Sequence, residues 1–168
     1  MIHYLYSLVK WEAAAWFILL ANLMNLVVLY ILPKKFPTSI TILILLIGLA
    51  LAKTANFILG IPPYDLYDIN DETDRLDLID LLLTAVYPPF GYYFLYIYNI
   101  WKFKEKSLFF YIFIVAAISV GFEYLAVLAN VFHYTGWKLF YSFPIYLISL
   151  SLTLLFYRVI MEKMPQGE

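Results

Sequence analysis

Cysteine is absent from this 168-residue chain, and charged side chains are few. The lack of cysteine excludes disulfide bonds, thiolate metal sites and cysteine nucleophiles. Charged residues make up 14% of the chain, against about 25% in a soluble domain. With a net charge of −1 the chain also lacks the strongly basic balance that phosphate binding requires, so nucleic acid is not expected as a partner.

The chain is strongly apolar: 64% of its residues are hydrophobic and 20% are aromatic. An apolar helix of about 20 residues crosses the hydrocarbon core of a bilayer. We therefore predict an all-α, polytopic membrane protein: one membrane domain over residues 1–168, built as a five-transmembrane-helix bundle. The helices are expected at about residues 12–33, 40–60, 80–101, 107–132 and 139–160, after an interfacial segment at 1–11.

The distribution of Lys and Arg predicts how this bundle is oriented. Basic residues accumulate in the short cytoplasmic loops of membrane proteins. One predicted side carries three of them, and the other carries seven: Lys34, Lys35, Lys102, Lys104, Lys106, Arg158 and Lys163. The side with seven is therefore expected to be cytoplasmic, which gives an N-out/C-in topology.

An acidic loop at residues 61–79 is expected to face outward. The stretch from Asp65 to Asp80 holds seven of the twelve acidic residues. The default expectation is a solvated loop that binds no cofactor, since charge runs are usually solvated. The alternative is a divalent cation site, because hard cations take carboxylate and carbonyl oxygens. Its candidate ligands are Asp68, Asn70, Asp71 and Asp74.

Two charged residues lie inside predicted spans, Lys53 and Glu123. A charge within a membrane costs a few kcal/mol, so such residues usually face the bundle interior and find partners. Both lie about 10 Å or slightly more from the outer ends of their helices, at 1.5 Å per residue. We expect them to pair, either as a binding or proton-relay site or as a structural ion pair. Snorkelling of Lys53 toward the headgroups is the alternative.

Small and polar residues recur at helical spacing around this pair, so that those of each helix share one face. They are Asn22 and Asn25; Gly48, Ala52, Lys53, Asn56 and Gly60; Asp80, Thr84 and Gly91; Ala116, Ser119, Glu123, Ala126 and Asn130; and Ser142, Ser149 and Thr153. In a membrane such residues allow close helix packing and interhelical hydrogen bonds, which is the expected role for most of them. Four asparagines are expected instead to line a small polar cavity that opens outward, because an amide is costly in lipid: Asn22, Asn25, Asn56 and Asn130.

Several segments resemble a family of small multi-helix integral membrane proteins of Bacillus-like bacteria. The resemblance rests mainly on Gly136-Trp137-Lys138 followed by Tyr141-Ser142-Phe143-Pro144-Ile145-Tyr146, and also on Tyr67-Asp68-Ile69-Asn70-Asp71 and Tyr87-Pro88-Pro89. It implies a multi-pass protein of the bacterial plasma membrane and implies no activity. The run Asn70-Asp71-Glu72-Thr73-Asp74 also resembles the NDxxD motif of membrane prenyltransferases, although those enzymes carry two such motifs and this chain has one.

These observations lead to one expected function and two alternatives. We expect a non-enzymatic accessory or binding membrane protein that engages a small ligand, a lipid or a partner through an outward polar cavity. The expected surroundings are the lipid bilayer and a membrane protein partner or a second copy of the chain. The first alternative is a membrane enzyme acting on a lipid or isoprenoid phosphate, with a divalent metal at the acidic loop. The second is a small carrier or channel subunit that uses Lys53 and Glu123.

Overall fold

The structure is a computed structural model that describes residues 2–59, 66–69 and 78–163, with side chains described at 13–59, 66 and 81–163. In these ranges the chain forms five helices and one pair of short strands. The elements in order are α1 (Ile2–Ile31), α2 (Thr38–Leu59), β1 (Tyr67–Ile69), α3 (Leu78–Trp101), α4 (Glu105–Leu128), β2 (Phe132–Tyr134) and α5 (Leu139–Lys163).

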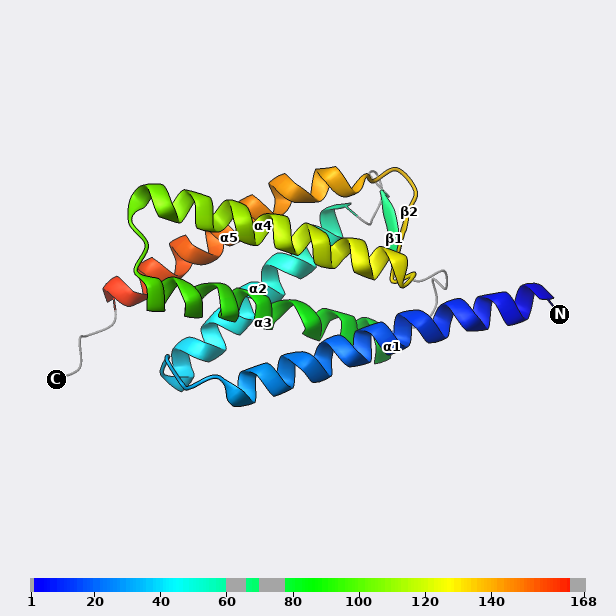
Figure 1. Cartoon of the computed structure of the whole chain (residues 1–168), viewed down its shortest axis with the longest axis horizontal. Coiled ribbons are helices and arrows are strands. Elements are labelled where there is room, and N and C mark those ends of the chain that lie inside the picture. The colour runs from blue at the N-terminus through cyan, green and yellow to red at the C-terminus, as the bar shows by residue number, and fades with distance from the viewer. Residues whose placement is uncertain (1, 60–65, 70–77, 164–168) are drawn as a thin grey trace.

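Successive helices run in alternate directions between the two ends of the molecule, and the chain termini lie at opposite ends (Figure 1). The third helix is central: α3 packs against α1, α2 and α5, while α4 packs against α5. Four helices (α1, α2, α4 and α5) are long and apolar enough to cross a membrane. The described part of α3, which contains five tyrosines and two prolines, is not among these four.

The predicted helices all form, but their bounds differ at two places. The first helix begins at Ile2 and not at about residue 12, because the leading segment has no proline or glycine that would end a helix. The fourth helix ends at Leu128, four residues before the predicted end. The remaining bounds agree with the predicted ones to within about three residues, which is the ordinary uncertainty of helix ends.

A Schellman motif ends α4. Asn130 has φ 58°, which is the left-handed conformation that commonly follows a helix. Its N–H donates to the carbonyl of Val127 at 2.9 Å, and the N–H of Val131 donates to the carbonyl of Ala126 at 2.9 Å. Val131 and Ala126 are both buried in one hydrophobic cluster, which supplies the apolar contact that accompanies this motif.

The strand pair is a feature that the sequence did not predict. β1 and β2 are antiparallel, with Tyr67 opposite Tyr134 and Ile69 opposite Phe132. The carbonyl of Leu66, just before β1, accepts hydrogen bonds from the N–H groups of residues 135, 136 and 137 at 2.9–3.1 Å. The start of the predicted acidic loop is therefore attached to the turn between α4 and α5.

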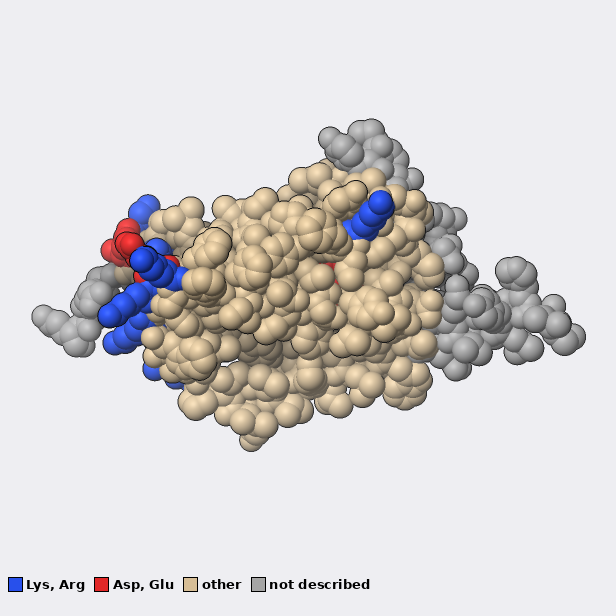
Figure 2. Space-filling model, turned by 45° about the horizontal axis from the view of Figure 1, so that its top comes forward, with Lys and Arg blue, Asp and Glu red and all other residues tan. Residues whose placement is uncertain are grey.

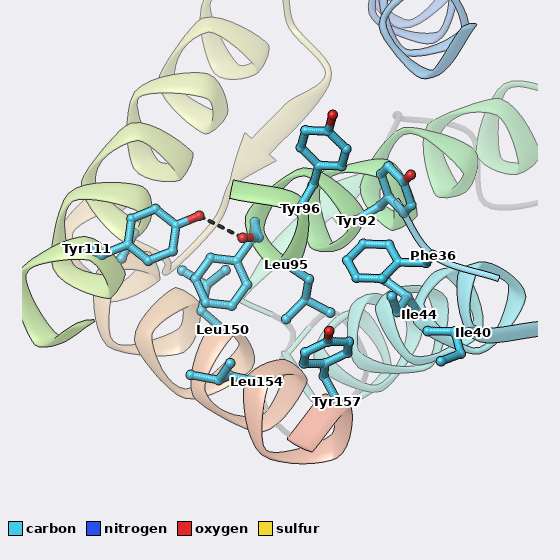
Figure 3. Packing of buried hydrophobic residues seen from close by; sticks show 12 residues of the cluster. Phe36, Ile40, Ile44, Tyr92, Leu95, Tyr96, Tyr111, Leu150, Leu154 and Tyr157 are labelled. Atoms are coloured by element: carbon cyan, nitrogen blue, oxygen red, sulfur yellow. Dashed lines mark hydrogen bonds between the residues drawn. The ribbon is translucent and has the colours of Figure 1, made fainter. Parts of the chain in front are cut away.

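The main hydrophobic core lies among α2, α3, α4 and α5 (Figure 3). Phe36 packs edge-on against Tyr92 and Tyr157, with both pairs of ring centroids 5.6 Å apart. On the other side of the core the Tyr111 ring stacks on Phe94 at 5.2 Å, and its hydroxyl donates to the Phe94 carbonyl at 2.7 Å. A smaller cluster around Ile18, which includes Ala126 and Val131, joins α1, α3 and α4.

Glycine allows α2 to approach α3 closely. A Cβ atom placed on Gly48 would lie 3.1 Å from the Cα atom of Pro88. That neighbour is backbone, so it cannot turn aside as a flexible side chain would. Pro88 and Pro89 also lack the N–H groups that would bond to the preceding turn of α3. The close contact between α2 and α3 therefore lies at the prolines, where α3 lacks two of its own backbone hydrogen bonds.

Among the described side chains, charge is concentrated at one end of the molecule (Figure 2). This end contains the α1–α2 turn, the α3–α4 turn and the end of α5. The described basic residues there are the seven that the sequence analysis grouped together: Lys34, Lys35, Lys102, Lys104, Lys106, Arg158 and Lys163. Between the two ends the visible surface is almost entirely uncharged, as a surface in contact with lipid should be.

Candidate functional site: a cavity inside the helix bundle

A partly open cavity of about 210 Å³ lies among the five helices, toward the end that carries the strand pair. Every helix and β2 contribute to its wall. Most of the wall is apolar or aromatic, and Glu123 is the one charged residue among the described side chains that line it. Such a lining, with a few polar groups that fix orientation, is typical of small-molecule sites.

Helical periodicity explains which residues reach the cavity. The predicted small and polar stripes supply Gly48, Ala52 and Asn56 from α2, Ser119, Glu123 and Ala126 from α4, and Ser142, Ser149 and Thr153 from α5. Spacings of three, four and seven place such residues on one face of a helix. Small side chains on these inward faces leave the space that the cavity occupies.

Neutral hydroxyl groups surround the Glu123 carboxylate. Its Oε1 atom accepts hydrogen bonds from the Tyr134 hydroxyl at 2.5 Å and from Ser142 Oγ at 2.6 Å. Tyr146 also makes a side-chain hydrogen bond to this carboxylate. The Trp137 indole N–H donates to Ser142 Oγ at 2.9 Å and so orients that hydroxyl. We call these five residues the Glu123 cluster.

The strand pair and the end of α4 place Tyr134 against Glu123, although the two residues are 11 positions apart. The Schellman motif turns the chain back after α4, and pairing with β1 holds β2 in place. Burial, followed by the hydrogen bond to Glu123, raises the pKa of the Tyr134 phenol well above its ordinary value. Tyr134 therefore stays protonated and acts as a donor to the carboxylate.

Lys53 does not join this cluster. Its side chain is exposed on α2 and does not line the cavity. Across the side chains that the structure describes, no Lys, Arg or His nitrogen lies within 4.0 Å of a Glu123 oxygen. The expected Lys53–Glu123 pair is thus not formed, because α2 directs Lys53 outward while Glu123 points inward. The exposed position agrees with snorkelling, the alternative considered for this lysine.

The four asparagines expected to line a cavity have different places. Asn56 does line it. Asn22 donates to the Leu82 carbonyl at 2.9 Å, and Asn25 donates to the Val86 carbonyl at 3.1 Å, so both bind the backbone of α3 near its prolines. Asn130 is the residue after α4 that has a left-handed backbone conformation. Asn22, Asn25 and Asn130 are therefore structural and do not line the cavity.

The candidate metal ligands fall outside what the structure describes. Asn70, Asp71 and Asp74 are not among the described residues, and Asp68 is described only through its backbone in β1. Elsewhere in the described chain no group of three His, Asp or Glu residues is placed to hold a metal ion. The acidic-loop cation site therefore stays a prediction.

Tyr134, Trp137 and Tyr146 are the site residues that sequence reasoning missed. The signal available was indirect: a carboxylate inside a span requires donors, and tyrosine, tryptophan and serine on the neighbouring turn and helix can supply them. Trp137, Ser142 and Tyr146 belong to the segment on which the family resemblance rested. Nothing in that segment alone, however, indicated that it faces Glu123.

The fold and the cavity together define a helical membrane-embedded protein with an internal site built around one carboxylate. Comparisons with known protein families, with curated proteins and with solved structures gave no match.

Proposed function

We propose that this chain is a non-enzymatic, multi-pass protein of the bacterial plasma membrane that binds a small, mainly apolar ligand in its internal cavity. The observation that supports this proposal is the cavity itself, lined from all five helices and largely by apolar side chains. The Glu123 cluster gives the cavity one polar wall.

The topology that accompanies this proposal has five spans and is N-out/C-in. The position of α3 inside the bundle supports its role as a fifth span, because its tyrosines and prolines face other helices there and are largely hidden from lipid. The cluster of basic residues at one end supports a cytoplasmic location for that end. The cavity and the strand pair are then nearer the outer face.

A cavity-filling substitution tests the proposed binding. We expect tert-butylbenzene to raise the thermal unfolding midpoint of the native protein in maltoside micelles. At ten times Kd the stabilisation would be about 1.4 kcal/mol, or roughly 3–5 °C for a chain of this length. Ala52→Phe places a ring inside the cavity and should abolish the rise, because Ala52 lines the cavity wall.

The matched control is Ala50→Phe, since Ala50 lies two residues away on the exposed side of the same helix. This variant should keep the full response to tert-butylbenzene. The proposal is overturned if the native protein shows no rise. It is equally overturned if both phenylalanine variants respond as the native protein does.

A small carrier or channel subunit remains the second candidate, on one specific observation. Glu123 is a carboxylate inside a span that faces a cavity, which is the usual position of groups that move protons or ions through membranes. In this revised carrier hypothesis, Glu123 and its hydroxyl partners form the functional group, and Lys53 takes no part. Uptake of protons or of a substrate into proteoliposomes, compared between the native protein and Glu123→Gln, would separate a carrier from a binding protein.

A further inference from the structure

Among the described side chains, the Glu123 carboxylate has hydrogen-bond donors but no counter-charge. Its described partners are the hydroxyls of Tyr134, Ser142 and Tyr146, all of which are neutral. Among the described side chains no cationic nitrogen lies within 4.0 Å of it. Glu123 is half-buried, so water screens its charge less than at a fully exposed position, and the carboxylate attracts a cation that enters the cavity. The site is therefore electrostatically prepared for a positive charge.

Aromatic rings form much of the wall of the cavity that Glu123 also lines. The rings come from α1, α3, α4, β2, the turn before α5, and α5 itself: Phe17, Phe90, Phe122, Phe132, Trp137 and Tyr146. Phe90 and Phe122 meet edge to face, with ring centroids 5.2 Å apart. The faces of aromatic rings attract cations, and rings of this kind around an organic ammonium are the usual way in which proteins recognise that group.

The lining also argues against a bare metal ion. Ca²⁺ takes six to eight oxygen ligands, and Mg²⁺ needs six in octahedral geometry and usually keeps several waters. The cavity wall offers one carboxylate, and its other side-chain oxygens belong to neutral hydroxyl and amide groups, of which Tyr134 and Ser142 already donate to Glu123. An organic cation needs no such ligand set, because its charge is spread over apolar methyl or methylene groups that aromatic walls can hold.

We infer that the ligand of this cavity carries an organic ammonium group, which Glu123 pairs by charge and the surrounding aromatic rings hold by cation–π contact. This inference rests on the proposed function and names the chemistry of its ligand. Ammonium groups reach such a site either as free small molecules or as the headgroup of a choline lipid. The shared chemistry is a positively charged nitrogen that carries apolar substituents.

Two probes of the same shape and different charge test the inference directly. Phenyltrimethylammonium and tert-butylbenzene differ only in the exchange of a positively charged nitrogen for a carbon. In maltoside micelles, which contain no ammonium groups, we expect the native protein to bind the cation about tenfold more tightly than the neutral compound. Binding is measured by the shift of the thermal unfolding midpoint with probe concentration.

Glu123→Gln keeps an acceptor oxygen for the hydroxyls and removes the charge, so its affinity for the cation should fall about tenfold while that for tert-butylbenzene stays the same. Glu105→Gln is the matched control, because Glu105 lies in the first turn of α4 at the opposite end of the helix. This control should bind both probes as the native protein does. If Glu123→Gln does not fold, Phe122→Leu serves in its place, since it removes a ring face and keeps apolar bulk.

The outcomes separate this inference from the proposed function. Equal or tighter binding of the neutral probe by the native protein overturns the ammonium inference and leaves the apolar cavity site intact. Binding of neither probe overturns both. A midpoint rise with short-chain phosphatidylcholine and none with the phosphatidylglycerol counterpart identifies a lipid headgroup as the source. A response to phenyltrimethylammonium with no response to either lipid identifies a free ammonium compound. Each of these last two outcomes supports the inference.

Discussion

Asn130 shows how the backbone, and not the side-chain type, can decide the role of a residue. Its amide suggested a cavity-lining group, because an amide is costly in lipid. The structure instead gives it φ 58° in the Schellman motif that ends α4 and turns the chain toward β2. Asparagine tolerates this conformation better than most residues, and glycine tolerates it best.

A pair of substitutions at Asn130 tests this role. Asn130→Gly should leave stability nearly unchanged, because glycine adopts positive φ without strain. Asn130→Val should destabilise the protein by about 1–2 kcal/mol, because the branched Cβ clashes in the left-handed region. Unfolding midpoints of the two variants in maltoside micelles are the measurement. Equal midpoints would show that the left-handed conformation does not matter for stability.

At the scale of elements, the packing of α2 against α3 depends on a small residue beside a proline. Gly48 faces the backbone of Pro88, and Gly48 also lines the cavity. The sequence identified Gly48 within a stripe of small residues. It did not show which helix the stripe would meet, because any membrane helix can pack against small residues.

Gly48→Ala is therefore expected to destabilise the bundle by about 1–3 kcal/mol, the usual cost of overpacking a rigid contact. Gly121→Ala is the matched control, since an added Cβ there would meet nothing within 4 Å. Stability of this control should be unchanged or slightly higher, because alanine favours a helix more than glycine does. A Gly48→Ala protein as stable as the Gly121→Ala protein would show that α2 and α3 can separate without cost.

At the scale of the whole molecule, much of the architecture was readable from the sequence and much of the site was not. Apolar runs predicted five helices, and helical spacing correctly placed Ser119, Glu123 and Ser142 on inward faces. The error concerned Lys53, because equal depth along two helices says nothing about the direction in which each side chain points. The strand pair was also missed, since three-residue strands carry almost no periodic signal.

Orientation in the membrane is the whole-molecule prediction, and the lack of native cysteine makes it simple to test. Thr135 and Ser107 are both exposed, the first beside β2 and the second at the basic end. In intact bacterial cells a membrane-impermeant maleimide should label Thr135→Cys, and it should label Ser107→Cys only after the membrane is permeabilised. The native chain should remain unlabelled. The reverse labelling pattern would show that the protein is N-in/C-out.

The pairing of β1 with β2 also sets the order in which the molecule is completed as it leaves the ribosome. Tyr67 and Tyr134, which are cross-strand partners, are separated by the whole of α3 and α4. The first three helices can enter the membrane and pack through α3 before β2 has been synthesised. Only when the chain has passed Tyr134, and then Ser142 and Tyr146, does Glu123 gain its hydroxyl partners. The proposed ligand site is thus a late product of synthesis, and a chain released after α3 contains only part of its apolar wall and lacks its charge.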